Sequence, residues 1–289
     1  MNRAFMEQKN INIFGSILPD ETAEVLEKGR KLPVGTIRQW GNKSYVKVAE
    51  GKWVLQEKSS MRISTEERYG GKSGNWTEER SKLHKSIIER HIRGAKKSEV
   101  PTVTLMMGAP GSGKGTIQRF LRSSGDMPES LISVDPDEIK TKDLKSDFDE
   151  YSKFNKVTAS RKVHEEGSYL AKQIIRELSE IGADFIIDKV FFKERGLRDQ
   201  IKQLTEKGYR VKIIMVSLPK EVGFTRALER ARKSGRYIDK KSASIAYDQI
   251  DATFDNIFSN PPEGVVEINQ FDTNVKLGEN PKLKKSKKL

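Results

Sequence analysis

The chain has 289 residues, of which 35% are apolar and none is cysteine, and its formal net charge is +13. This length and apolar content can support one large domain, or a medium domain with an appendage. The lack of cysteine excludes a disulfide framework and any thiolate metal site. The sequence contains neither a signal-peptide core nor an apolar run of membrane-spanning length, so we expect a soluble, cytoplasmic protein with no membrane partner.

The positive charge is concentrated at the two ends of the chain. Residues 1–100 hold 20 Lys and Arg against 13 Asp and Glu, and residues 101–280 hold 29 against 28. Residues 281–289 hold five Lys and no acidic residue. Because net charge bears on partners rather than on fold, the ends predict contact with an anionic partner such as nucleic acid. The equal alternative is that these lysines only keep the chain soluble.

The N-terminal part predicts a small β element followed by a linker. Within residues 31–58, apolar and polar residues alternate around the turn pairs Gly41-Asn42 and Glu50-Gly51. This pattern predicts a three-stranded meander, and we assign residues 1–58 to it. Residues 59–80 are rich in Ser, Gly and charge with little periodicity, which predicts a flexible linker.

From Pro101 onward, short apolar runs alternate with helical patterns, as expected for a parallel sheet covered by helices. The pattern therefore predicts an α/β fold, a three-layer sandwich with a mainly parallel sheet, over residues 81–280. The expected strands are 102–107, 131–135, 184–188, 211–217 and 264–270, and the expected helices are 81–94, 156–181, 194–207, 220–234 and 239–258. Residues 281–289, PKLKKSKKL, are too charged to pack and predict a disordered tail.

The strongest local signal is GAPGSGKGT, which lies between an expected strand and an expected helix. In such a loop the glycines let the backbone wrap around phosphates, while the N–H groups and the helix N-terminus face the anion. The lysine reaches the β and γ phosphates. The loop thus predicts a binding site for ATP or GTP, made of Gly108, Ala109, Pro110, Gly111, Ser112, Gly113, Lys114, Gly115 and Thr116.

The magnesium ligands are less obvious, because Gly115 stands where the usual pattern has the Ser or Thr that binds Mg²⁺. We expect Thr116 to bond the α phosphate, and Mg²⁺ to be held by the nucleotide, water and a carboxylate. Asp188 is the candidate carboxylate because it ends an expected strand, although an Asp there can equally be a helix N-cap. The three histidines show no metal-ligand spacing; they are His84, His91 and His164.

Two further carboxylates follow the second expected strand in SVDPDEIK. Asp135 and Asp137 would lie beside the phosphate loop if this strand neighbours the first one. A carboxylate there can orient an acceptor hydroxyl and take its proton. We favour this role for Asp137, whereas Asp135 is equally consistent with a cap before Pro136 or with a metal ligand.

A cluster of arginines lies where an expected helix gives way to a loop, in GFTRALERARKSGRYIDKK. Guanidinium groups in such a place can neutralise the γ phosphate during transfer. The alternative is a solvated helix face. The candidates are Arg226, Arg230, Arg232 and Arg236.

Taken in order, these segments resemble the zeta toxin family of P-loop kinases from about Val100 to Thr273. The similar stretches are GAPGSGKGT, SVDPDEIK, IIRELSEIGADFIID, EKGYRVKIIMVSLP and ARKSGRY. The resemblance implies a phosphotransferase that phosphorylates the 3′-hydroxyl of UDP-N-acetylglucosamine, or a related amino sugar, with ATP or GTP. It also makes an antitoxin protein a candidate partner.

Carried to this sequence, the resemblance makes Lys114 the phosphate-loop lysine and Asp137 the catalytic base. Asp188 stands where the family usually has a Glu. Arg236 is similar to the later phosphate-contacting arginine, and Arg226 or Arg230 to the earlier one.

Two departures concern the acceptor pocket. The family's Gly-Thr after the acidic residue is Lys189-Val190 here, and its substrate-contacting glutamate in the long helix has only Glu165 or Glu166 as candidates. These departures keep two rivals open. One is a polynucleotide 5′-hydroxyl kinase, and the other is a nucleotide-binding phage structural or packaging protein with weak or no catalysis. The segment GTIRQWGNKSYVKVAEGKW is similar to β cassettes of phage-encoded proteins, which would suggest a virion assembly as partner.

Overall fold

The structure, a computed structural model, describes residues 37–40, 43–49, 52–55, 63–71, 74–154, 156–234, 237, 240–276 and 278–289. It divides into two compact units. One contains the first three strands, and the other consists of Thr65–Ser152 with Lys156–Leu289.

The first unit contains a three-stranded antiparallel sheet at the place where the sequence predicts a meander. Strands β1 (Ile37–Trp40), β2 (Lys43–Ala49) and β3 (Lys52–Leu55) follow one another in the order β1-β2-β3. Trp53 is buried and pairs in register with the buried Lys47. A buried aromatic side chain of this size supplies much of the core that so small a sheet can build.

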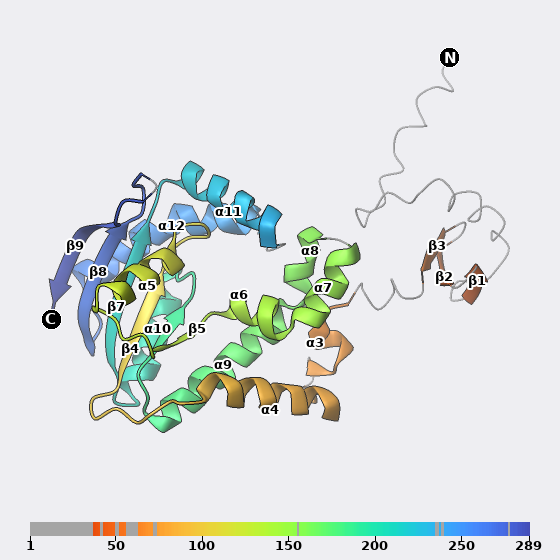
Figure 1. Ribbon diagram of the computed structural model, residues 1–289, viewed down its shortest axis with the longest axis horizontal. Coiled ribbons are helices and arrows are strands. Elements are labelled where there is room, and N and C mark those ends of the chain that lie inside the picture. Colours follow the sequence, from red (N-terminus) through yellow and green to blue (C-terminus); the bar gives the residue numbers. More distant parts are fainter. Residues whose placement is uncertain are drawn as a thin grey trace, which may run out of the picture. The chain divides into compact units, whose positions relative to one another are not determined.

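The second unit is built on a six-stranded sheet with the order β5-β6-β4-β7-β8-β9 (Figure 1). The first five strands are parallel, and β9 pairs antiparallel with β8. The strands are β4 (Thr102–Met107), β5 (Ile132–Val134), β6 (Phe185–Asp188), β7 (Arg210–Ser217), β8 (Val265–Asp272) and β9 (Lys282–Lys288). This confirms the predicted α/β class.

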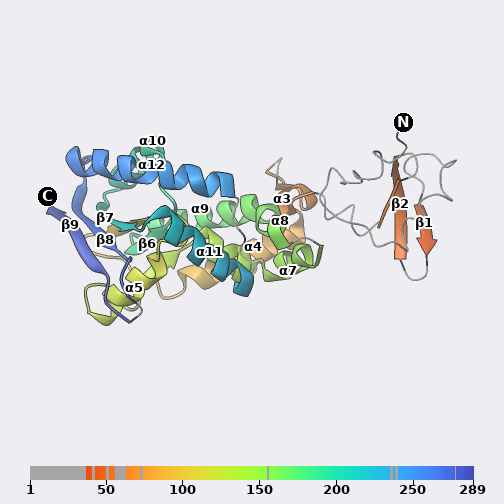
Figure 2. The same cartoon turned by 90° about the horizontal axis from the view of Figure 1, so that it is seen from above.

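Helices cover both faces of this sheet, with α10 and α12 on one side and α5 on the other (Figure 2). Helix α4 runs along α9 (Figure 1). The helices are α3 (Thr65–Arg68), α4 (Glu78–Ile92), α5 (Lys114–Ser123), α6 (Pro136–Glu138), a π-helical turn η2 (Ile139–Asp143), α7 (Lys145–Phe154), α8 (Lys156–Lys162), α9 (His164–Ile181), α10 (Glu194–Thr205), α11 (Lys220–Ser234) and α12 (Lys240–Ser259).

The sequence of β4 is a continuous apolar run because this strand lies inside the sheet, between β6 and β7. Val103, Leu105, Met106 and Met107 are all buried because helices cover both faces of the sheet.

The ends of the elements follow local rules. Thr77 caps α4 by accepting a hydrogen bond from the Arg80 N–H at 3.3 Å. The described residues include no helix with the length and apolar character to cross a bilayer.

The structure differs from the prediction at the long helix over 156–181, which is two helices separated at Val163. The Thr65 hydroxyl donates to the Lys162 carbonyl at 3.4 Å, and this carbonyl lies at the break. The partner is 97 residues away in sequence, so helical periodicity could not indicate the break.

The predicted linker and tail are also ordered where they are described. The segment 59–80 contains α3 and the start of α4, and both belong to the second unit, which is built on the six-stranded sheet and begins at Thr65. The predicted disordered tail instead forms β9, because the edge of β8 offers backbone partners. Lys285 pairs with Asp255 at 2.7 Å and lies 5.7 Å from the centre of the Phe258 ring.

Removal of residues 281–289 should therefore destabilise the sheet. We expect the truncated chain to melt several degrees lower and to self-associate, because β8 would become an unpaired edge without prolines. Thermal denaturation and size-exclusion chromatography would measure both effects. As a control, glutamine at Lys282, Lys284 and Lys288 removes charge but keeps the strand, and should leave the elution volume of the full-length chain unchanged. A truncated chain that elutes and melts as the full-length chain does would show that β9 contributes nothing.

Candidate functional site

The glycine-rich loop connects the end of β4 to the start of α5, as its sequence predicts. Gly111 and Gly113 have φ values of +81° and +93°, which side chains rarely adopt. At Gly111 a Cβ atom would also lie 2.2 Å from the Gly223 carbonyl oxygen of α11. Both glycines are therefore required by the path of the backbone, which curls tightly between the strand and the helix.

Three side chains hold the outside of this loop. The Tyr247 hydroxyl of α12 donates to the Pro110 carbonyl at 2.6 Å, and the Thr273 hydroxyl donates to the Ser112 carbonyl at 2.5 Å. The Arg226 guanidinium of α11 in turn donates to the Thr273 carbonyl at 3.1 Å. Tyr247 and Thr273 were not among the predicted site residues, because no local motif marks them; they lie 137 and 161 residues from their partners.

The inside of the loop presents donors. The Lys114 ammonium donates to the Gly108 carbonyl at 3.0 Å and lies 3.6 Å from a carboxylate oxygen of Asp188. Among the described residues, Ser112 Oγ is one of the buried side-chain atoms that lack a hydrogen-bond partner. A buried hydroxyl without a partner is costly unless a ligand satisfies it. The loop therefore fits an anion with several oxygen atoms, as a polyphosphate has.

Asp188 reaches the loop because β6 is the neighbour of β4, with Asp188 in register with Met106. Its carboxylate accepts a hydrogen bond from the Gln118 amide at 2.9 Å. Burial raises the pKa of Asp188, the Lys114 ammonium lowers it, and the charges of Asp137 and Glu138 raise it further. Asp137 follows β5, which runs parallel to β6 and β4, so it lies at the same edge of the sheet as the loop.

The segment after β5 lies one strand further from the loop than predicted, since β6 separates β5 from β4. Asp135 caps α6 by accepting from the Asp137 N–H at 2.7 Å, with Pro136 at the first helical position. This supports the capping interpretation of Asp135. The Asp137 carboxylate forms an ion pair with Lys140 and is half exposed.

No group of three His, Cys, Asp or Glu side chains that could hold a metal ion occurs in the described residues. Among the predicted ligands, Thr116 accepts a hydrogen bond from Arg119 at 3.2 Å, and Asp135 is engaged as a cap. Asp188 is the carboxylate that remains beside the loop. Its hard oxygen donors fit Mg²⁺ if phosphates and water supply the other ligands.

The predicted arginines take different places. Arg226 contacts Thr273 behind the loop, as described above. Arg230 is exposed one turn further along α11. Burial raises the pKa of Tyr247 to about 12, even though the charges of Arg226 and Arg230 act to lower it. Arg232 is exposed too, while Arg236 lies outside the described residues.

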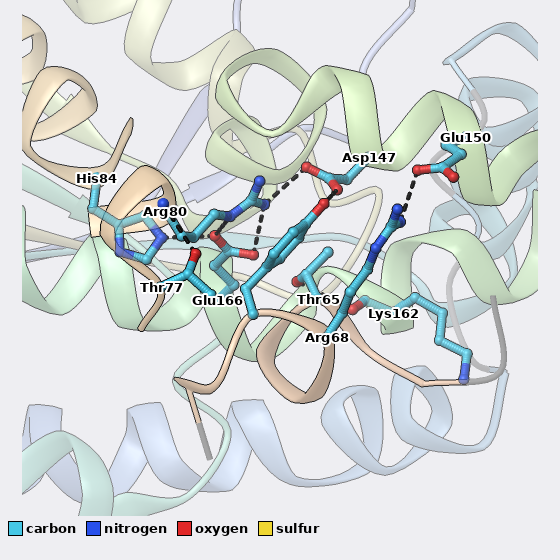
Figure 3. A network of polar contacts seen from close by, with 10 residues as sticks. Thr65, Arg68, Thr77, Arg80, His84, Asp147, Glu150, Lys162 and Glu166 are labelled. Carbon is cyan, nitrogen blue, oxygen red and sulfur yellow. Dashed lines mark hydrogen bonds and ion pairs between the residues drawn. The ribbon is translucent and has the colours of Figure 1, made fainter. Parts of the chain in front are cut away.

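The glutamate candidates on α9 separate clearly. Glu165 is exposed, whereas Glu166 is fully buried in a network shown in Figure 3. The Glu166 carboxylate pairs with the Arg80 guanidinium at 2.5 and 2.8 Å and with His84 Nε2 at 2.7 Å. Arg80 also bonds Asp147 of α7 at 2.8 Å. Glu166 thus joins α4, α7 and α9, which argues against a role in contacting substrate.

The charge of Glu166 should make the fold sensitive to acid. Burial alone would raise the pKa of Glu166, but hydrogen bonds from His84 and Arg80 outweigh it and lower the pKa to about 2, from an ordinary value of 4.5. A lowered pKa stabilises the folded chain above pH 4.5, and this contribution, about 3 kcal/mol, is lost as the pH falls toward 2.

The variant Glu166→Gln should therefore be less stable at neutral pH by about 3 kcal/mol, and its stability should fall less between pH 5 and pH 3. Denaturant unfolding at several pH values measures this difference. Glu180→Gln, on the exposed side of the same helix, serves as the control. Parallel pH profiles for the wild type and Glu166→Gln would contradict the assigned role of this carboxylate.

Comparison with known proteins agrees with this architecture. The zeta toxin family model matches residues 86–278. Toxin zeta of Streptococcus pyogenes is 28% identical over 145 residues, which cover 50% of this chain and 48% of that protein. Toxin zeta of Enterococcus hirae is 27% identical over 145 residues, with 50% and 49% coverage. The chain thus spans about half the length of these relatives in the match.

Solved structures share the fold at low identity. A structure from the PezAT chromosomal toxin-antitoxin system of Streptococcus pneumoniae has a TM-score of 0.57 at 16% identity, over 73% of this chain and 82% of that chain. The AvrRxo1-ORF1:-ORF2 complex with ATP has a TM-score of 0.56 at 19% identity, over 78% and 76%. Since the family model covers more than half of the sequence, this chain belongs to the zeta toxin family.

Proposed function

We propose that this chain is a P-loop kinase that transfers the γ-phosphate of ATP or GTP to a hydroxyl group of a small acceptor such as UDP-N-acetylglucosamine. The observation that carries this proposal is the loop itself. Its interior holds the Lys114 ammonium and the unpartnered Ser112 hydroxyl next to the Asp188 carboxylate.

The nucleotide would bind with its phosphates against the loop. The N–H groups at the start of α5 and the Lys114 ammonium would neutralise the phosphate oxygens. Lys114, whose ammonium contacts the Gly108 carbonyl, would exchange this contact for a phosphate oxygen. Asp188, with Thr116, would hold Mg²⁺, which supplies charge neutralisation at the β and γ phosphates when bound.

The acceptor would lie on the side of Asp137. As base, this carboxylate takes the proton of the acceptor hydroxyl while that oxygen bonds to the γ phosphorus, and the nucleoside diphosphate leaves with the electrons of the broken bond. Its position supports this role, because Asp137 is half exposed and follows β5 at the edge of the sheet where the loop and Asp188 lie. Arg226 and Arg230 of α11 would stabilise the transferring charge, and we propose the same role for Arg236, which lies outside the described residues.

One cation lies against Asp137, since the Lys140 ammonium forms an ion pair with its carboxylate. Burial and then the Lys172 ammonium lower the pKa of Lys189, which directly follows Asp188 at the end of β6. Cations at this edge of the sheet would attract an anionic acceptor, such as one that carries the diphosphate of a nucleotide sugar. Lys189 stands where the family usually has a glycine, so it would add to acceptor binding.

Partners follow from the same family. The Streptococcus pneumoniae structure comes from a toxin-antitoxin system. We propose an antitoxin protein as a partner for this chain too.

Lys114→Ala should reduce phosphotransfer at least a hundredfold, because the loop loses the cation that binds the phosphates. The assay follows the γ-phosphate of labelled ATP into UDP-N-acetylglucosamine and a panel of other hydroxyl compounds. Lys207→Ala, on an exposed turn, is the matched control and should retain wild-type activity. Full phosphotransfer by Lys114→Ala to every acceptor would mean that the loop has another role.

Asp137→Asn should lower kcat by a factor of about 10² to 10⁴, because an amide cannot accept the hydroxyl proton, while ATP affinity changes little. Steady-state kinetics and calorimetric titration with an ATP analogue separate these effects. Asp199→Asn on the exposed face of α10 controls for the loss of a carboxylate. If the two variants had equal kcat, Asp137 would not be the base.

A further inference from the structure

A buried lysine lies directly behind the proposed base. Lys140 belongs to the π-helical turn η2, and its side chain is only 5% exposed. A buried ammonium is rare unless it is paired. Its Nζ contacts Asp137 Oδ1 as an ion pair and lies 3.2 Å from His164 Nδ1 at the start of α9. One buried cation therefore connects the half-exposed Asp137 to a different helix.

The aliphatic part of the Lys140 side chain is packed as closely as its ammonium group. Gly167 of α9 passes over it: a Cβ atom at Gly167 would lie 2.7 Å from Lys140 Cγ and 3.3 Å from the Pro136 carbonyl oxygen. Any side chain at position 167 would have to displace the lysine or the backbone before Asp137. The glycine thus allows α9 to hold Lys140 in one orientation.

Both elements that carry this contact are anchored by α4. At the start of α9, Glu166 is bound by Arg80 and His84. At the end of η2, Asp143 is bound by Arg90 at 2.5 Å and by His91 at 2.9 Å. Because α4 holds η2 and α9 together, the ammonium of Lys140 has little freedom to leave its two partners.

The state of His164 agrees with its role as acceptor. Burial of the imidazole and then the Lys140 ammonium lower the pKa of His164. The carboxylates of Glu165 and Asp137 act to raise it, and the charge of Lys189 lowers it as well. Measured over the whole residue, His164 is exposed. A lowered pKa keeps the imidazole neutral at neutral pH, so that Nδ1 can accept a hydrogen bond from the ammonium.

We propose that Lys140 is a positioning residue for the kinase reaction, which fixes the carboxylate of Asp137 toward the acceptor hydroxyl, and that His164 and Gly167 hold Lys140 in place. This inference rests on the proposed function of Asp137 as base. A half-exposed carboxylate on a short helix can rotate about its side-chain bonds, and a fixed cation behind it selects one orientation. Such preorganisation affects the rate of transfer more than the binding of either substrate.

The test is a double-mutant cycle between Lys140→Met, which keeps the length of the stem but not the charge, and Asp137→Asn. We expect Lys140→Met to lower kcat about ten- to a hundredfold, while KM for both substrates and ATP-analogue binding stay within about twofold. In the Asp137→Asn background, the same change should lower kcat by no more than about twofold, because Lys140 acts through that carboxylate.

Lys145→Met is the matched control, since it removes an exposed lysine from a nearby i,i+4 ion pair and should leave kcat unchanged. His164→Leu guards against misfolding of Lys140→Met, because this exposed residue can lose its acceptor atom without emptying a core. It should lower kcat three- to tenfold on the wild type and have no further effect on Lys140→Met. Thermal denaturation of each variant checks the fold.

The outcomes separate the two proposals. If the wild type transfers phosphate to no acceptor, the proposed function fails and the role of Lys140 fails with it. If the wild type is active but Lys140→Met keeps its kcat, only the positioning role is overturned. The same conclusion follows if Lys140→Met lowers kcat as strongly in Asp137→Asn as in the wild type, since the lysine would then be structural.

Discussion

The site depends on the parallel pairing of β4 with β6 on one side and β7 on the other. Parallel strands end at the same edge of a sheet, so the glycine-rich loop after β4 and the carboxylate that ends β6 must lie together. The contact of 3.6 Å between Lys114 and Asp188 is a direct consequence. Parallel strand pairing brings Lys114 and Asp188 together although they are far apart in sequence.

The loop keeps its shape because the remainder of the sheet and two helices support it. Thr273, just after β8, and Tyr247 of α12 bond the carbonyl groups of Ser112 and Pro110. Carbonyl groups that are held outward leave the N–H groups directed inward, which is the polarity that an anion site needs. Gly223 makes this support possible, since a Cβ atom there would overlap the Tyr247 hydroxyl.

A second constraint, buried charge, organises the side of the site that carries Asp137. A buried carboxylate needs full compensation, and Glu166 obtains it from Arg80 and His84, which precede the segment matched by the family model (Figure 3). The ion pairs of Arg80 and His84 thereby join α4, α7 and α9, which are distant in sequence. Helix α4 also binds η2, which carries Lys140, so the same buried charges stabilise these helices and support the orientation of Asp137.

The sequence by itself determined the α/β class, the glycine-rich loop between a strand and a helix, and the strand that ends in Asp188, because each depends on local patterns of apolar residues and glycine. Only the tertiary structure decided that β6 lies between β4 and β5, that α8 ends at Lys162 where the Thr65 hydroxyl meets its carbonyl, that the lysine-rich tail forms β9, and that Glu166 is buried. Each of these results depends on partners far apart in the chain, on strand order or on the compensation of a buried charge, and local periodicity carries no information about such partners.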